Sequence, residues 1–468
     1  MSEQKRKPKV SYRDQLTTVS DDGKRVWVFP KKPKGRFTNY RKIVGYFIFA
    51  FFILAPIIPY KGDQFLLFNV LERKFILFGA IFWPQDFHIV VMALITFVVF
   101  IVLFTVVYGR IFCGWMCPQT IFMELIFRPV EYFIEGDFMA QKRLKKQEWN
   151  FEKIWKRVAK YSIFYLIAFV IGNTFLSYLI GWDQLKVYIT DGPVQHLGTF
   201  IAIAVFSGVI FFIYGFFREQ VCTIACPYGR LQGVFLDKKS MVITYDYKRG
   251  EPRKGEVPAG EEVGDCSNCR ACVNVCPTNI DIRDGIQLEC INCTACIDAC
   301  DAQMDKAGKP RGLVRYDSEE GIETGKHHLL NPRSIAYSAV LLILLGVVVA
   351  MFSLRTDFET TILRQRGTLF QKYGDDAYSN IYQIEVVNKT RKKHNVTVKL
   401  LEPEGTIQMM TEDIVADKGE VGKGKFLTIL KSSTIESSQE KLKFGIYSDD
   451  ELISEYEVTF VAPRIFDK

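Results

Sequence analysis

Five long runs without a charged residue set the strongest limit on how this chain can fold. Each has roughly 18–26 residues, and roughly 20 apolar residues cross the hydrocarbon core of a bilayer as a helix. Because the backbone must satisfy its own hydrogen bonds inside a bilayer, the runs predict transmembrane helices. The five runs are Ile43 to Tyr60, Phe87 to Gly109, Tyr161 to Trp182, Gly192 to Phe217 and Ser334 to Leu354.

The basic residues between these runs predict the orientation of the chain. The tail at residues 1–42 and the connection after the second run are rich in Lys and Arg, whereas the connections after the first and third runs hold few. Lys and Arg accumulate on the cytoplasmic side of a membrane. We therefore expect the N-terminus and residues 218–332 inside, and everything after Leu354 exported. The net charge of +8 follows this distribution, so nucleic acid is not an expected partner.

One further apolar stretch, Phe65 to Trp83, is interrupted by Glu72, Arg73 and Lys74. These charges argue against a sixth span, and the stretch is expected to form an interfacial or re-entrant helix.

Eight of the twelve cysteines form two matched runs of the kind C-x2-C-x2-C-x3-C. This is the spacing of bacterial ferredoxins with two 4Fe–4S clusters, in which the fourth cysteine of each run reaches the other cluster. A pair of structural zinc sites is the competing interpretation, but two matched runs disfavour it. The predicted ligands of one cluster are Cys266, Cys269, Cys272 and Cys300, and those of the other are Cys276, Cys290, Cys293 and Cys296.

The surroundings of this motif are acidic. Pro277 follows Cys276, whereas Asp301 stands in the corresponding place after Cys300. Proline shapes a turn but is not a ligand, so ligation is expected to survive its absence. The surplus of acidic residues is expected to favour the oxidised clusters and to lower their reduction potential.

The other four cysteines form two C-x3-C-P motifs, Cys113 with Cys117 and Cys222 with Cys226. Each motif follows an even-numbered span, which indicates an internal duplication of a two-span unit. On a helix, residues i and i+4 share a face, and two thiolates so placed select soft ions such as Cu(I). The four cysteines are therefore candidate catalytic residues and copper ligands. A further redox centre and a pair of redox dithiols stay open, and burial as small apolar side chains is the structural alternative.

After the fifth run the sequence alternates between apolar and polar residues, as in strands with one buried face. The strands expected are Ile381 to Val387, Asn395 to Leu401, Phe426 to Leu430, Lys441 to Tyr447 and Ile453 to Val461. They predict an immunoglobulin-like β-sandwich without a disulfide. No nucleophile or acid–base set is apparent in it, so it is expected to bind a partner.

These patterns predict a multi-domain membrane protein with an α-helical membrane domain of five transmembrane helices, a two-cluster ferredoxin-like insert and a C-terminal immunoglobulin-like β-sandwich. The expected parts are a basic tail at 1–42, a duplicated four-helix membrane domain at 43–217, a cytoplasmic segment at 218–332, a fifth transmembrane helix at 333–354 and an exported domain at 355–468. The ferredoxin domain itself is expected at about 260–305.

This order of parts closely resembles the cytochrome c oxidase accessory protein family, the CcoG, RdxA and FixG group. The stretch Cys113-Gly-Trp-Met-Cys117-Pro and the ferredoxin block are the most specific points of likeness. The resemblance implies a protein of the bacterial inner membrane that reduces Cu(II) to Cu(I) for assembly of the cbb3-type cytochrome c oxidase. It implies as partners the oxidase assembly factors or copper chaperones and transporters.

Two other functions fit the same sequence. The chain could be a quinol-linked membrane ferredoxin that passes electrons to a reductase, or a non-catalytic assembly scaffold whose clusters are structural. An exported sandwich disfavours the first, because a plain quinol module has no need of it. In each electron-transfer case the donor or acceptor on the cytoplasmic side is unidentified, and a homodimer stays open.

Overall fold

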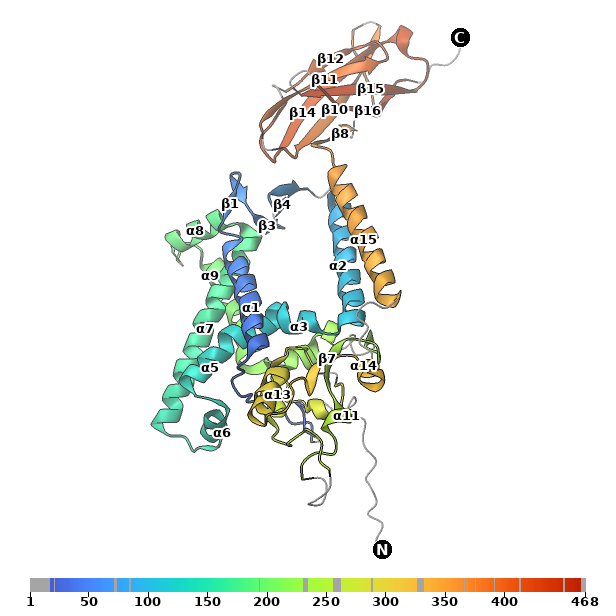
Figure 1. Ribbon diagram of the computed structural model, residues 1–468. Helices are drawn as coiled ribbons and strands as arrows, with labels where there is room; N and C mark the ends of the chain where they lie inside the picture. The colour runs from blue at the N-terminus through green and yellow to red at the C-terminus, as the bar shows by residue number, and fades with distance from the viewer. Residues whose placement is uncertain are drawn as a thin grey trace. The chain divides into compact units, whose positions relative to one another are not determined.

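The computed structural model describes residues 17–20, 22–70, 74–83, 86–192, 194–229, 235–255, 262–287, 289–325, 332–365, 367, 369–374, 376–390, 392–411, 414–448 and 451–463. The chain divides into two compact units, one formed by residues 1–69 and 90–348 and the other by residues 70–89 and 349–468. Figure 1 labels the helices and strands of both.

In the described residues, five helices are long and apolar enough to cross a membrane. They confirm the predicted spans, and they are α1 (Arg36–Leu54), α2 (Phe87–Tyr108), α7 (Phe151–Ile180), α9 (Leu197–Phe212) with its π-helical extension η3 (Ile213–Phe217), and α15 (Pro332–Ser353). In the first unit α7 packs against α9 and α1. Their shared core includes Phe127 and Phe164, both fully buried.

Two spans begin earlier than predicted. Helix α1 begins at Arg36 instead of Ile43 and ends at Leu54, just before Pro56, because proline cannot continue a helix. Helix α7 begins at Phe151 instead of Tyr161, since the side chain of Asn150 caps its first turn. Basic residues in the first turns of both helices hid these starts from a search for uncharged runs.

The remaining elements of the first unit are short. The helices after α2 are α3 (Ile111–Trp115), α4 (Pro118–Ile121), η2 (Phe122–Phe127), α5 (Arg128–Ile134), α6 (Phe138–Lys146), α8 (Trp182–Asp191) and η4 (Val221–Ala225). The insert contains β6 (Val242–Tyr245), α11 (Tyr247–Gly250), α12 (Ala271–Asn274), η5 (Ile282–Asp284), α13 (Ala295–Lys306), β7 (Val314–Asp317) and α14 (Glu319–Thr324). Strands β6 and β7 pair antiparallel.

The prediction of a helix at 65–83 is wrong. The described residues there form strands β3 (Leu66–Asn69), β4 (Lys74–Leu77) and β5 (Ala80–Phe82), after the short β1 (Pro59–Tyr60) and β2 (Asp63–Gln64). Strands β4 and β5 form a hairpin around Phe78 and Gly79, which both have positive φ. A two-residue turn of that kind matches the twist of antiparallel strands and excludes a continuous helix.

The second unit contains the predicted β-sandwich, and all five predicted strands are present. One sheet has the order β12-β14-β10-β8, with β9 also paired to β10, and the other has the order β13-β11-β15-β16. Rings of Tyr382, Phe426 and Phe444 pack in its core with centroids 5.3–5.6 Å apart. The strands are β8 (Phe358–Arg364), β9 (Gln371–Lys372), β10 (Ala377–Asn388), β11 (His394–Glu402), β12 (Thr406–Met409), β13 (Ile414–Ala416), β14 (Val421–Lys431), β15 (Gln439–Ser448) and β16 (Glu451–Val461).

Candidate functional site

The eight cysteines of the ferredoxin insert gather around two cavities. Cys296 and Cys300 lie one turn apart on α13, each at a different cavity. One cavity is lined by Cys266, Cys269, Cys272 and Cys300. The other is lined by Cys276, Cys290, Cys293 and Cys296, and also by Cys272.

The backbone between these cysteines is shaped to hold an anionic group. Asn268 and Arg270 flank the second cysteine of the first run, and Asn292 and Thr294 flank the second cysteine of the other run. All four have φ between 51° and 64°. Loops that alternate right- and left-handed residues turn their N–H groups toward one centre, as is common at iron–sulfur sites. The residues present therefore fit one 4Fe–4S cluster in each cavity, which would supply one-electron redox chemistry.

Burial keeps the thiols of Cys272 and Cys300 neutral when no metal is bound. It raises the pKa of Cys272 and of Cys300 to about 12 in each case. Metal ligation requires the thiolate, so cluster insertion must release protons from this core.

The acidic residues around the clusters are paired with hydrogen-bond donors or cations. This pairing changes the expectation of a low reduction potential that was drawn from their number. The carboxylate of Asp298 accepts hydrogen bonds from the backbone N–H groups of Phe37 and Thr38 at 3.2 and 2.7 Å, at the N-terminus of α1. Asp281 pairs with Arg283 at 2.5 Å. Positive helix ends and guanidinium groups offset these charges, so a count of acids does not describe the field at the clusters.

The C-x3-C-P motifs do not form the continuous helix expected of them. Helix α3 ends before Met116, and Cys117 is extended, with φ −64° and ψ 125°. Cys226 ends η4 with a similar backbone, φ −75° and ψ 112°. A residue before proline is driven toward extended conformations, so the second cysteine of each pair leaves its helix.

The two motifs nevertheless follow the same local path. The N–H of Cys117 donates to the carbonyl of Phe112 at 2.9 Å, and the N–H of Cys226 donates to that of Val221 at 2.7 Å. Both bonds span five residues, a π-type turn that occurs often at functional sites. The motifs therefore present two half-sites of like geometry.

The structure brings the four membrane cysteines together. Burial, together with the neighbouring Cys117, Cys113 and Cys226, raises the pKa of Cys222 to about 12. The side chain of Thr120 lies beside both Cys117 and Cys222 and lowers the pKa of each. Within the described ranges, no group of three or more His, Cys, Asp or Glu side chains is close enough to hold a single metal ion.

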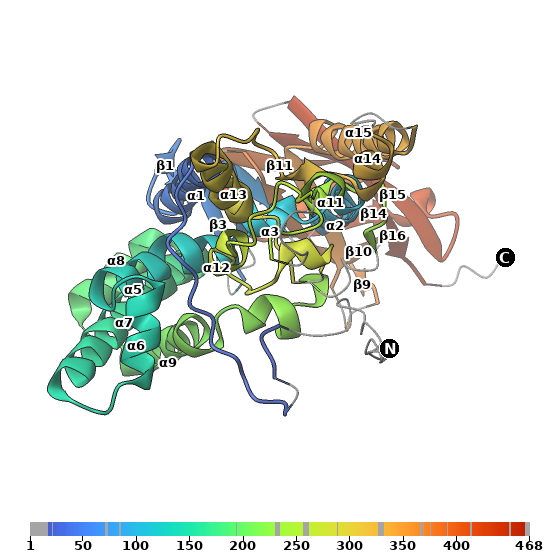
Figure 2. The same cartoon turned by 60° about the horizontal axis from the view of Figure 1, so that its bottom comes forward.

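The first motif packs against the loop that carries Ile291, Asn292 and Cys293, and Figure 2 shows α3 beside the insert. Cys113 packs against a buried group that contains Ile291 and Cys293. A Cβ atom added to Gly114 would lie 2.4 Å from the carbonyl oxygen of Ile291, so only glycine permits this approach. The indole Nε1 of Trp115 donates a hydrogen bond to the carbonyl of Asn292 at 3.2 Å.

Two buried arginines that sequence reasoning did not single out reinforce this contact. The Nε of Arg41 donates to the carbonyl of Gly114 at 2.7 Å. Arg110 donates to the carbonyls of Gly229 and Cys290, and so joins both motifs to the insert. The sequence signal was present, since Arg110 lies three residues before Cys113 at the end of an apolar run. In the sequence alone, this arginine indicates only membrane orientation.

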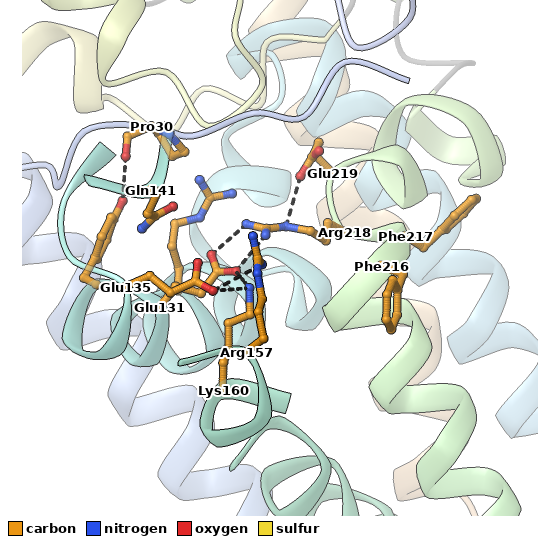
Figure 3. A network of polar contacts seen from close by, with 12 residues as sticks. Pro30, Glu131, Glu135, Gln141, Arg157, Lys160, Phe216, Phe217, Arg218 and Glu219 are labelled. Carbon is orange, nitrogen blue, oxygen red and sulfur yellow. Dashed lines mark hydrogen bonds and ion pairs between the residues drawn. The ribbon is translucent and has the colours of Figure 1, made fainter. Parts of the chain in front are cut away.

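A buried ionic network borders the second motif (Figure 3). Arg218 binds Glu131 at 2.8 Å, and Lys160 binds Glu135 at 2.9 Å. Arg25 of the N-terminal segment binds Glu219 at 3.0 Å. These pairs tie α5, α7 and the residues around Cys222 into one rigid assembly.

The fold and this site define a membrane-bound iron–sulfur electron-transfer protein. A model of a 4Fe–4S binding domain matches residues 90–146, a model of a 4Fe–4S dicluster domain matches residues 217–319, and a model of the immunoglobulin-like fold at the C-terminus of FixG matches residues 348–463.

The chain belongs to the FixG/RdxA family. It is 36% identical to RdxB of Cereibacter sphaeroides over 80% of this chain and 81% of that protein. It is 37% identical to RdxA of the same organism over 77% and 79% of the two chains. It is 38% identical to the nitrogen fixation protein FixG of Rhizobium meliloti over 63% and 57%. The resemblance that the motifs suggested is thereby confirmed.

Proposed function

We propose that this protein carries electrons from a cytoplasmic donor through its two ferredoxin clusters to the four membrane cysteines, where Cu(II) is reduced to Cu(I). The ligands of the first cluster are Cys266, Cys269, Cys272 and Cys300, and those of the second are Cys276, Cys290, Cys293 and Cys296. The product serves assembly of a cbb3-type cytochrome c oxidase, through assembly factors or through copper chaperones and transporters that meet the exported sandwich.

The packing of Cys113 against the buried group that contains Cys293 carries this proposal. Proximity of a membrane thiol to a predicted ligand of the second cluster supports a path on which the electron leaves the insert at that ligand. The chemistry balances as a one-electron exchange, in which a reduced ferredoxin cluster is oxidised and Cu(II) becomes Cu(I), with no proton transferred. Soft thiolates favour the product over the substrate, which adds driving force.

An anaerobic titration tests the proposal. The purified protein is reduced, Cu(II) is added, and cluster reoxidation is followed together with capture of Cu(I) by a chromogenic chelator. One Cu(I) per electron is expected, and the variant with serine at Cys113, Cys117, Cys222 and Cys226 is expected to yield none above background. The matched control is Met116→Leu, which alters an exposed thioether within the same motif and is expected to leave the yield unchanged. Equal yields from the serine variant and the parent would refute the proposal.

A second candidate function, oxidation of a membrane quinol, is favoured by a cavity of about 540 Å³ between α1, α7, α8 and α9. Its polar edge includes His196, whose Nε2 lies 3.2 Å from a carboxylate oxygen of Asp191. Such a pair can accept a proton from a quinol hydroxyl. The near wall of this cavity includes Phe169, which lies about 14 Å along α7 from Lys160 of the ionic network. The contact between the first membrane motif and the ferredoxin insert has no counterpart at this cavity among the described residues, so copper reduction is the better-supported function.

Reduction of the clusters by a quinol distinguishes the two functions. Rapid anaerobic reduction that is lost in His196→Gln would favour the quinol-linked protein, and its absence would eliminate this candidate. Normal oxidase assembly by a stable variant whose clusters cannot be reduced would instead favour a scaffold.

A further inference from the structure

We propose that Cys113, Cys117, Cys222 and Cys226 together hold a third iron–sulfur cluster of the cubane type. This inference rests on the proposed electron relay and deepens it. The four thiolates would be the protein's last electron carrier, and Cu(II) would be reduced at that carrier instead of being chelated by all four sulfurs.

The ligand count is the first argument. A 4Fe–4S cluster needs four thiolates, but the matched segment 90–146 contains only Cys113 and Cys117. The structure supplies the missing pair, because Thr120 and Cys222 line one cavity, and Arg110, three residues before Cys113, donates to the carbonyl of Gly229, three residues after Cys226. The equal π-type turns at Cys117 and Cys226 present the two pairs in the same manner.

The spacing of the thiols is the second argument. A single thiolate-bound ion holds its sulfurs at about 2.3 Å, which requires ligands in tight contact. Within the described residues, no group of three or more His, Cys, Asp or Glu side chains is arranged to hold a single ion, either in the membrane motifs or in the two ferredoxin sets. The membrane cysteines share this property with the two sets whose sequence spacing is that of cubane ligands.

Buried cations beside the motif provide the third argument. Arg128 is 1% exposed and lines a cavity together with Thr120 and Cys222. Its Nε pairs with Glu124 at 3.0 Å, but in the described part of the chain its two amino groups have no hydrogen-bond partner. Unpaired buried donors of this kind are costly. A cluster with four thiolates is anionic and would accept these N–H groups.

The charge balance of the surrounding ionic network also favours an anionic cluster at this site. Five basic side chains meet four carboxylates there, which leaves one positive charge in excess for an anionic group. The basic residues are Arg25, Arg128, Arg157, Lys160 and Arg218, and the acids are Glu124, Glu131, Glu135 and Glu219. The sulfur of Cys226 already accepts a hydrogen bond from the N–H of Gly229 at 3.4 Å, a bond typical of cluster sulfurs.

Iron content tests the inference without reference to copper. The full-length protein, reconstituted anaerobically in detergent, is expected to bind about 12 iron atoms per chain, and the variant with serine at the four membrane cysteines about eight, because each cubane holds four. Mössbauer spectra should show loss of one cluster in that variant, with both ferredoxin clusters retained. Equal iron content in the variant and the parent would overturn the inference.

A second variant keeps the inference testable if the first variant misfolds. Arg128→Met removes the unpaired donors but no cysteine, and it is expected to shift the reduction potential of one cluster only. A variant with serine at Cys276 and Cys290 is the matched control, since it should lose a ferredoxin cluster and retain the membrane one. If the membrane serine variant keeps all its iron but no longer makes Cu(I), the third cluster is refuted and copper reduction stands. If it loses about four iron atoms and still makes Cu(I), the third cluster is supported and copper reduction at this site is refuted.

Discussion

The indole N–H of Trp115 donates a hydrogen bond to the backbone carbonyl of Asn292, which joins the first membrane motif to the loop of the second ferredoxin cluster. Asn292 has φ 51° and lies directly before Cys293. The contact therefore fixes the distance between a cluster ligand and Cys113, the first membrane thiol. Electron transfer depends steeply on such a distance, and the predictions below test how this interface and its supports are built.

Replacement of Gly114 by alanine is expected to separate the two redox sites. The new methyl group would meet the carbonyl of Ile291 and the backbone nitrogen of Cys293, neither of which can rotate away. We expect a loss of about 1–3 kcal/mol of stability and slower reoxidation of the clusters by Cu(II) in stopped-flow measurements. Gly346→Ala on α15, where the added methyl has open space, is the control. An unchanged rate in Gly114→Ala would show that this contact does not set the electron path.

Asp298→Ala is expected to loosen the start of α1. The substitution removes the acceptor for two backbone N–H groups and for the hydroxyl of Thr38. Loss of a helix cap costs about 0.5–2 kcal/mol, and hydrogen exchange should rise at Phe37 and Thr38 first. Asp305→Ala on the same helix α13 removes only an exposed pair with Arg311 and should leave exchange unchanged. Equal protection of α1 in Asp298→Ala and the parent would contradict the capping role.

Glu131 is expected to make the membrane-side network sensitive to acid. Burial alone would raise the pKa of Glu131, but Arg218, Lys160 and Arg128 together hold it below the usual 4.5. A depressed folded pKa gives a stabilisation that is present above the unfolded pKa and is lost as the pH falls through the folded value. Glu131→Gln should therefore be less stable at pH 7 by about 3–5 kcal/mol, and the difference should shrink below a pH of about 4.5. Hydrogen exchange of α5 and α7 measures it, and cluster loss in acid affects both proteins alike. A difference that does not vary with pH would be inconsistent with this assignment.

Removal of the clusters is expected to unfold the insert and to spare the sandwich. Cys266, Cys272 and Cys300 belong to the buried core of the insert, so extraction of iron leaves a cavity and unpaired thiols inside it. The core of the sandwich contains no cysteine. Hydrogen exchange after chelation should show lost protection in α13 and retained protection in β10 and β14. Retained protection in α13 would mean that the insert folds without metal.

Asp86 is expected to stabilise the second unit. It is buried and pairs with Arg355 at 2.9 Å and with Lys389 at 2.6 Å. Asp86→Ala would leave Arg355 without this carboxylate, whereas Lys389 keeps its pair with Glu359 at 2.9 Å. A buried charge that loses its partner costs about 3–5 kcal/mol, which is measurable as a lower denaturant midpoint of the sandwich. Glu385→Gln, which breaks a pair with Lys423 on the surface, is the control and should have little effect. A similar midpoint in both variants would argue against a role for Asp86.

The sequence by itself determined the features that depend on local spacing. The predicted cluster ligands followed from the gaps between cysteines, because a chain that turns around a cubane leaves few other registers, and the structure gathers these cysteines around two cavities. The transmembrane spans followed from long runs without charged residues, since an uncharged helix is one of the few structures that a bilayer admits. The sandwich strands followed from alternation, because one face of each strand is buried.

Only the tertiary structure decided what depends on contacts between distant residues. The start of α1 depends on Asp298, which is more than 250 residues away and supplies its cap. The strands at 66–82 depend on a left-handed turn at Phe78, a conformation that a search for apolar runs does not detect. The approach of Cys113 to Cys293, and of the two C-x3-C-P motifs to each other, is a matter of packing between segments that no local pattern encodes. That packing is the physical basis of the electron path that we propose for the twelve cysteines.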